Sequence, residues 1–127
     1  MLRTNMLIAA LVLFYSTSLH AQNVESFLAA VKSGSASGVA KHFEAQVELT
    51  ILSQSSAYSK AQAEAVLRDF FQKKNVKGLD IKHQGTSPEG ARYIMGVLQT
   101  TAGNYNLYIF GKNTGGLFIV REVRIEE

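Results

Sequence analysis

One stretch of this sequence has the spacing of an amphipathic helix and constrains the fold more than any other. In residues 59–73 the apolar side chains recur at helical spacing and form one stripe, while polar side chains fall mainly on the other side. The members of the stripe are Ala63, Val66, Leu67, Phe70 and Phe71. Ser59 is a good N-cap, and Gln62 can close a capping box with it. A stripe that ends in two phenylalanines requires a large apolar partner surface, which we expect a sheet to provide.

Most of the remaining sequence has the pattern of β-strands. Apolar and polar residues alternate, or apolar runs lie between glycine-containing turns, as is typical of strands and hairpins. The strands are predicted at residues 47–51, 79–83, 91–101, 104–112 and 117–126, with a loop at 53–56 and a turn at 85–90. Several later strands are apolar on both sides, which indicates that helices cover one face and that a partner subunit or a closure of the sheet covers the other.

The order of these elements defines the fold class. A covering helix is predicted to begin with Asn23 as its N-cap and to end at residues 32–34, with a further helical turn around Val39. Helices followed by a run of antiparallel strands, with one strand before the long helix, form an α+β arrangement. We therefore expect a curved antiparallel sheet wrapped on the helix at residues 59–73.

The first 21 residues have the layout of a secretory signal peptide. Arg3 precedes an apolar run at residues 6–15, and small or polar residues follow up to Ala21, which can stand just before a cleavage site. The apolar run is too short to cross a bilayer core of about 30 Å. We predict a signal peptide over residues 1–21 and one domain over residues 22–127, which is exported and does not span the membrane after cleavage.

Composition argues against several classes of function. The formal net charge of +3 falls to +2 without Arg3 and involves no run of basic residues, so nucleic acid is not an expected partner. The chain has no cysteine, which excludes thiol catalysis and disulfides. No residue spacing resembles a zinc site, and no glycine-rich turn precedes a helix that could bind phosphate. We predict neither a metal nor a cofactor.

His83 is the residue best suited by type and position to a catalytic role. It follows Leu79 and Ile81 in an alternating strand, so it is expected to point inward, where a neutral imidazole could act as a general base. The other interpretation is a buried histidine that hydrogen-bonds to a backbone group or to Tyr93. Asp80 is expected on the opposite face of the strand, beside Lys82, so it would not form a dyad with His83. No catalytic residue is therefore assigned.

Four residues remain as candidates for a pocket. Tyr58, Tyr93 and Tyr108 could line an aromatic pocket together with His83, although tyrosines on strands more often serve the core or the rim of an interface.

Six short strings of the sequence resemble a family of short secreted bacterial proteins known as domain of unknown function 4783. They lie at residues 47–51, 58–64, 69–71, 83–85, 90–93 and 124–126. The order of elements is similar to the cystatin-like fold of the nuclear transport factor 2-like superfamily. This resemblance implies a curved sheet around a long helix, frequent dimerisation through the sheet, and often a pocket between sheet and helices. Some members resemble isomerases or dehydratases, whereas many only bind or assemble, and the family supplies no functional residue to transfer.

Three functions are compatible with these observations. The preferred one is an exported non-catalytic module that binds a small apolar ligand or a protein partner such as an envelope protein, with a homodimer through the sheet as its expected oligomeric state. The alternative is a small-molecule isomerase, dehydratase or hydrolase with His83 as base and Tyr93 polarising the substrate. It requires both side chains to converge on one cavity. A purely structural subunit instead predicts no cavity and a large apolar outer sheet face.

Overall fold

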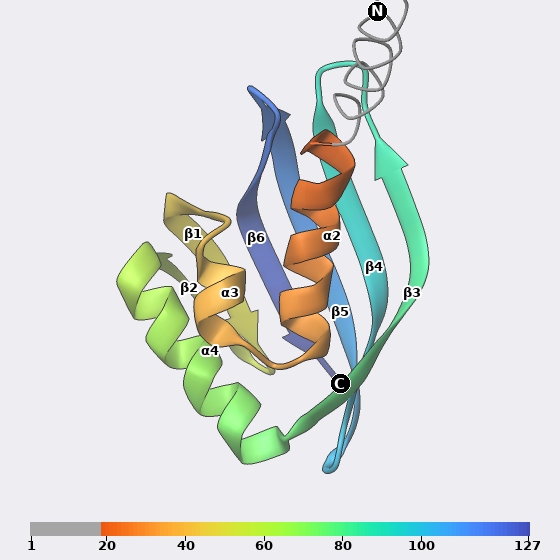
Figure 1. The fold of residues 1–127 in the computed structure, drawn as a ribbon. Helices are drawn as coiled ribbons and strands as arrows, with labels where there is room; N and C mark the ends of the chain where they lie inside the picture. Colours follow the sequence, from red (N-terminus) through yellow and green to blue (C-terminus); the bar gives the residue numbers. More distant parts are fainter. Residues whose placement is uncertain (1–18) are drawn as a thin grey trace, which may run out of the picture.

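The computed structural model describes residues 19–127, and for residues 19–22 the backbone alone. Residues 1–18 of the predicted signal peptide therefore lie outside the described residues. The elements are α2 (Leu19–Lys32), α3 (Ala36–Ala40), β1 (Phe43–Ile51), β2 (Gln54–Ser59), α4 (Lys60–Lys74), β3 (Val76–Thr86), β4 (Ala91–Thr100), β5 (Gly103–Thr114) and β6 (Leu117–Glu126). No helix of the described part is long and apolar enough to span a membrane. The helices lie on one face of the sheet (Figure 1), which we call the inner face.

Helix α4 has the boundaries and the buried stripe that its sequence predicts. The Gln62 amide donates to Ser59 Oγ at 3.2 Å, and the Ser59 amide donates to Gln62 Oε1 at 3.3 Å, which completes the capping box. Asn75 ends the helix in the left-handed conformation, with a φ of 55°. All members of the apolar stripe are buried except Val66, which is half-buried. The predicted helix is confirmed.

The sheet has six strands in the order β2-β1-β6-β5-β4-β3. Its pairings are antiparallel except for that of β1 with β6, which is parallel. Strands β4, β5 and β6 match the predicted ones closely and form two hairpins. The α+β class and the curved, largely antiparallel sheet are therefore confirmed, and the parallel pairing is the difference from the prediction.

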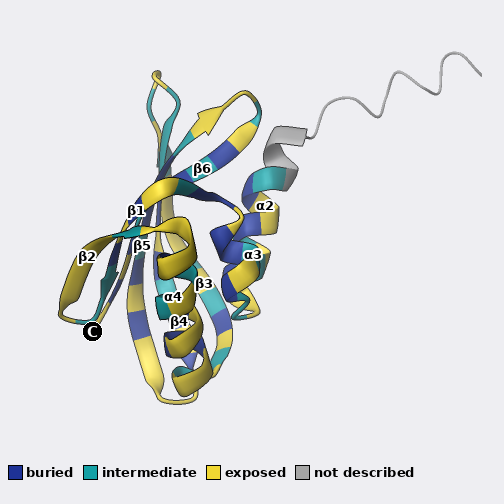
Figure 2. Ribbon diagram, turned by 90° about the vertical axis from the view of Figure 1, so that its left-hand side faces the viewer, coloured by how far each residue is buried: buried dark blue, intermediate teal, exposed yellow. Residues whose placement is uncertain are grey.

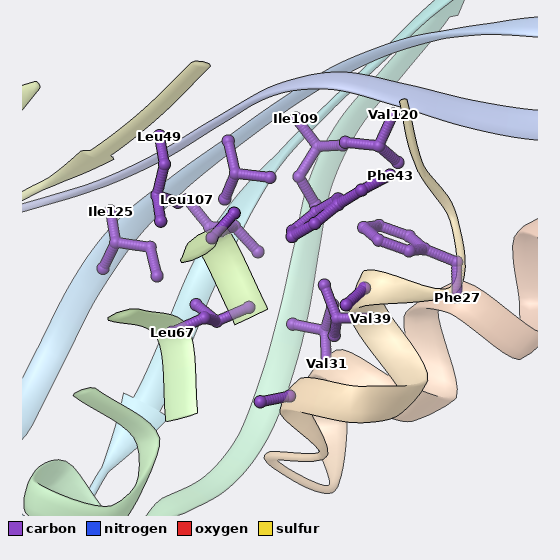
Figure 3. Packing of buried hydrophobic residues seen from close by; sticks show 14 of the residues in the cluster. Phe27, Val31, Val39, Phe43, Leu49, Leu67, Leu107, Ile109, Val120 and Ile125 are labelled. Atoms are coloured by element: carbon purple, nitrogen blue, oxygen red, sulfur yellow. The ribbon is translucent and has the colours of Figure 1, made fainter. Parts of the chain in front are cut away.

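A single apolar core fills the space between the helices and the inner face (Figure 3). Phe27 of α2 is fully buried and meets the Phe118 ring of β6 edge to face, with 5.5 Å between the ring centroids. Phe70 of α4 meets Tyr105 of β5 in the same way, at 5.4 Å. Edge-to-face contacts are favourable aromatic arrangements and fix helices and sheet relative to one another.

Two local predictions are wrong. Asn23 does not cap a helix, because α2 begins at Leu19; the Asn23 Oδ1 instead accepts a hydrogen bond from the Phe118 amide at 2.6 Å. The residues predicted as a loop belong mostly to strand β2, which pairs along its whole length with β1. Strand β2 is polar and exposed, so it lacks the apolar alternation by which a strand is recognised.

Candidate functional site

The space between sheet and helices is the first candidate for a pocket, because the superfamily resemblance implies one there. The cavity found at this place has a volume of about 10 Å³. It is lined by Phe27, Val31, Val39, Leu67, Phe71, Leu98, Leu107, Ile109, Val123 and Ile125. Such a volume is about that of one water molecule. This enclosed space between the sheet and the helices therefore has no room for a small organic molecule.

His83 lies on the outer face of the sheet, opposite to its predicted position. Ile81 pairs with Gly96, but His83 pairs with Met95, so β3 contains one extra residue between these pairs. A β-bulge of this kind reverses the alternation of the residues that follow it. His83 is consequently exposed, whereas Ile81 packs against the core. The prediction that His83 points inward was wrong because it assumed a regular strand without a bulge.

Gly96 explains how this bulge fits against β4. A Cβ atom at this position would lie 2.5 Å from the Asp80 carbonyl oxygen and 3.3 Å from the Ile81 Cα. The bulged backbone of β3 thus occupies the space that any other side chain at position 96 would need. Asp80 pairs with Val97, on the same face as His83, so the prediction of opposite faces is also wrong. The Asp80 carboxylate is exposed and pairs with Lys82 at 2.7 Å, as expected.

His83 and Tyr93 are in contact. His83 Nε2 lies 3.3 Å from the Tyr93 hydroxyl, and the ring centroids are 5.6 Å apart at 42°. The Tyr93 ring lies directly over Gly85, where any side chain would overlap it. Of the two hydrogen-bond partners considered for His83, the structure contains Tyr93, but on the exposed face rather than in a buried pocket.

The three candidate tyrosines do not line one pocket. Tyr58 pairs with Val47 and packs against the core on the inner face, beside α4. Tyr108 lies on the outer face, where it pairs with Met95 and its ring is 5.3 Å from the Arg124 guanidinium. Only Tyr93 and Tyr108 therefore share a face with His83.

The outer face carries an apolar patch on the neighbouring strands β4 and β5. We call this the outer patch; it consists of Tyr93, Met95, Val97, Tyr108 and Phe110. Met95 is 45% exposed and the others are half-buried. The sequence analysis did not single out Met95 or Phe110, although the two-sided apolar pattern of these strands contained the signal.

Two open grooves lie on the outer face, one over the outer patch and one beside it. One, of about 420 Å³, includes Lys82, Met95, Tyr108 and Arg124 in its lining. The other, of about 450 Å³, runs along β1 and β6 and is lined by Glu44, Glu48, Arg121, Glu122 and Phe110 among others. Arg121 pairs with Glu44 and Arg124 with Glu122, each at 3.3 Å. The apolar patch is therefore bordered by charges of both signs.

His42 is a buried titratable side chain whose surroundings lower its pKa. Burial lowers its pKa, the hydrogen bond from Nδ1 to the Phe118 carbonyl at 3.3 Å raises it, and the charges of Lys60 and Lys41 lower it further. The Phe27 ring meets the imidazole edge to face at 5.3 Å. These contacts make His42 a structural residue of the core. No group of three or more metal-ligating side chains gathers within residues 23–127, whose side chains the structure describes.

Comparisons with known proteins agree with this architecture. The family model described as "Domain of unknown function (DUF4783)" matches residues 24–126. A DUF4783 family protein from Bacteroides ovatus, known from its crystal structure, has 29% identity and a TM-score of 0.75, over 80% of this chain and 92% of that one. A second, from Bacteroides uniformis, has 25% identity and a TM-score of 0.75, over 81% and 94%.

More distant relatives share the fold alone. An NTF-2 like protein of unknown function from Shewanella oneidensis has 11% identity and a TM-score of 0.63, over 87% of this chain and 98% of that one. No curated protein matches this sequence. Since the family match covers most of the chain, this protein belongs to the DUF4783 family and has a nuclear transport factor 2-like fold.

Proposed function

We propose that this protein is an exported, non-catalytic protein-binding module that associates with a second copy through its outer patch. The observation that carries the proposal is the filled inner space, where the cavity is only about 10 Å³. Of the two kinds of partner expected from the sequence, a small apolar ligand is therefore the less favoured. Export rests on the signal-like residues 1–21.

The outer patch has the composition of a protein interface. Aromatic residues and methionine are enriched in such interfaces, and a polar rim commonly surrounds them. Here Tyr93, Met95, Tyr108 and Phe110 form most of the patch, and both acidic and basic side chains border it. An apolar face of this kind on a small domain is typical of an interaction site.

A second copy is compatible with this surface because its border carries both acidic and basic side chains. Glu44 and Arg121 lie on the β1 and β6 side of the outer patch, and Asp80 and Lys82 lie on the β3 side. In a twofold arrangement the same surface contacts itself, so acidic side chains of one copy can oppose basic side chains of the other.

Replacing Met95 by aspartate tests this interface. A short carboxylate cannot extend out of a buried contact, so Met95→Asp should weaken association through the outer patch by about a hundredfold or more. Leu117→Asp is the matched control, because Leu117 is 54% exposed but lies where β6 begins, away from the outer patch. The molar mass measured by light scattering over a range of concentrations distinguishes the two variants. Equal self-association of both variants, or a wild type that has no outer-face contact, would refute the proposal.

The enzyme remains the second candidate because His83 and Tyr93 are in hydrogen-bond contact at 3.3 Å. The exposure of His83 argues against it, since an open site neither excludes water nor encloses a substrate. Small carbonyl compounds and esters are suitable test substrates. Turnover that is lost in His83→Asn, with the oligomeric state unchanged, would favour the enzyme over the binding module.

A further inference from the structure

The two edges of the sheet differ in how they are protected against pairing. β3 carries two register shifts and, within eleven residues, the charged side chains Lys77, Asp80 and Lys82. Bulges and charges are common devices by which natural proteins prevent edge strands from pairing with other chains. β2 has neither device: its six residues pair with β1 without a shift, and none of them is charged or proline.

The free side of β2 is accessible. Every residue of the strand is exposed except Tyr58, which is half-buried (Figure 2). β2 contacts β1 on one side and α4 behind it, and it ends the strand order of the sheet. In an antiparallel strand, alternate residues direct their amide and carbonyl groups away from the existing neighbour. β2 therefore presents a short row of backbone donors and acceptors to a further strand.

We propose that β2 of one copy pairs in antiparallel fashion with β2 of a second copy. The six strands of each copy would then join into one continuous sheet. In such a symmetric pair, each β2 residue faces another member of the same uncharged set, so no like charges are opposed. Hydroxyl groups can also bond across the contact, as Thr50 Oγ1 donates to Ser55 Oγ at 2.9 Å between β1 and β2.

The difference between the two edges of the sheet also limits association through this contact to a dimer. Pairing of β2 with β3 of the next copy would be head to tail and would continue into a filament. The bulges and charges of β3 oppose it. Pairing of β2 with β2 uses the same surface on both copies and ends at the dimer. This contact shares no residue with the outer patch, so a chain that used both would form assemblies larger than a dimer.

Substitutions of opposite charge at Ser56 test the β2 contact. A twofold axis near the middle of β2 places Ser56 of the two copies opposite or diagonal to each other. Ser56→Lys should raise the dissociation constant of this contact by about tenfold, and Ser56→Glu by a similar factor. An equimolar mixture of the two variants should associate at least as tightly as the wild type, since opposite charges then meet. Recovery in the mixture cannot arise if the variants fail to fold.

The control is Thr86→Lys, which adds the same charge at an exposed residue of β3 and should leave the constant unchanged. Sedimentation velocity on the purified protein, with and without Met95→Asp, separates this contact from the outer patch. The Met95→Asp protein should still form dimers that Ser56→Lys weakens. A Met95→Asp protein that is monomeric at every concentration would overturn the β2 contact and leave the outer-patch interface standing. A dimer insensitive to Ser56→Lys would also overturn it.

Discussion

Adding a methyl group at Gly96 tests whether the close approach of β3 to β4 holds the bulge that places His83 on the outer face. An alanine Cβ at this position would lie 2.5 Å from the Asp80 carbonyl oxygen. Carbon and oxygen in normal contact are roughly 3.3 Å apart or more, so one strand must move by about 0.8 Å. The obstructing atom belongs to the backbone of β3 and cannot rotate away. We expect Gly96→Ala to destabilise the fold by about 1 to 3 kcal/mol, the usual cost of overpacking with a backbone shift.

Gly78→Ala is the matched control on the same pair of strands. A Cβ at Gly78 would lie 2.8 Å from Gln99 Oε1, the end of an exposed and flexible side chain. Rotation of Gln99 relieves this contact, and alanine restricts the unfolded chain, so the free energy of unfolding should change by less than about 0.5 kcal/mol. Urea denaturation of both variants gives the comparison. If Gly96→Ala is as stable as Gly78→Ala, the close approach of β3 to Gly96 does not hold the bulge in place.

Two further predictions concern the core. Phe70 is 5% exposed and packs on Tyr105, so Phe70→Ala should cost about 3 to 5 kcal/mol in urea denaturation, and a loss below about 1 kcal/mol would contradict its core position. Burial lowers the pKa of His42 in the folded state, so the unfolded state binds the proton more readily. Stability should therefore be fully present above a pH of about 6.5 and decrease as the pH falls toward the lower, folded pKa. His42→Gln, which does not ionise, should show a smaller decrease over this range, and parallel profiles for the two proteins would contradict the assignment.

Local sequence was sufficient for the elements whose signals are local. The capping box of α4 involves only Ser59 and Gln62, and its apolar stripe repeats within fifteen residues, so neither depends on the rest of the chain. The β4–β5–β6 meander is similarly marked by glycine turns between apolar runs. The family resemblance extended this local information to the complete fold.

The candidate site was only partly predictable. Tyr93 was one of two hydrogen-bond partners considered for His83, beside a backbone group, and the structure contains the contact with Tyr93. Its location on the outer face was not expected, because one additional residue in β3 reverses the alternation after Ile81. That bulge depends on the absence of a side chain at Gly96, a residue of the neighbouring strand. Tyr58 and Tyr108 were grouped in one candidate pocket by residue type, and the sheet separates them onto opposite faces.

The long capped helix, the meander that follows it and the α+β class could be predicted from sequence, since apolar periodicity and turn residues act over a few neighbouring positions. Three features become visible only in the folded chain: β2 is a strand, β1 and β6 pair in parallel, and His83 faces outward. Each of these depends on a neighbour distant in the sequence. β2 is polar and becomes a strand because β1 satisfies one side of its backbone. The same polar, uncharged character leaves its other side free to pair.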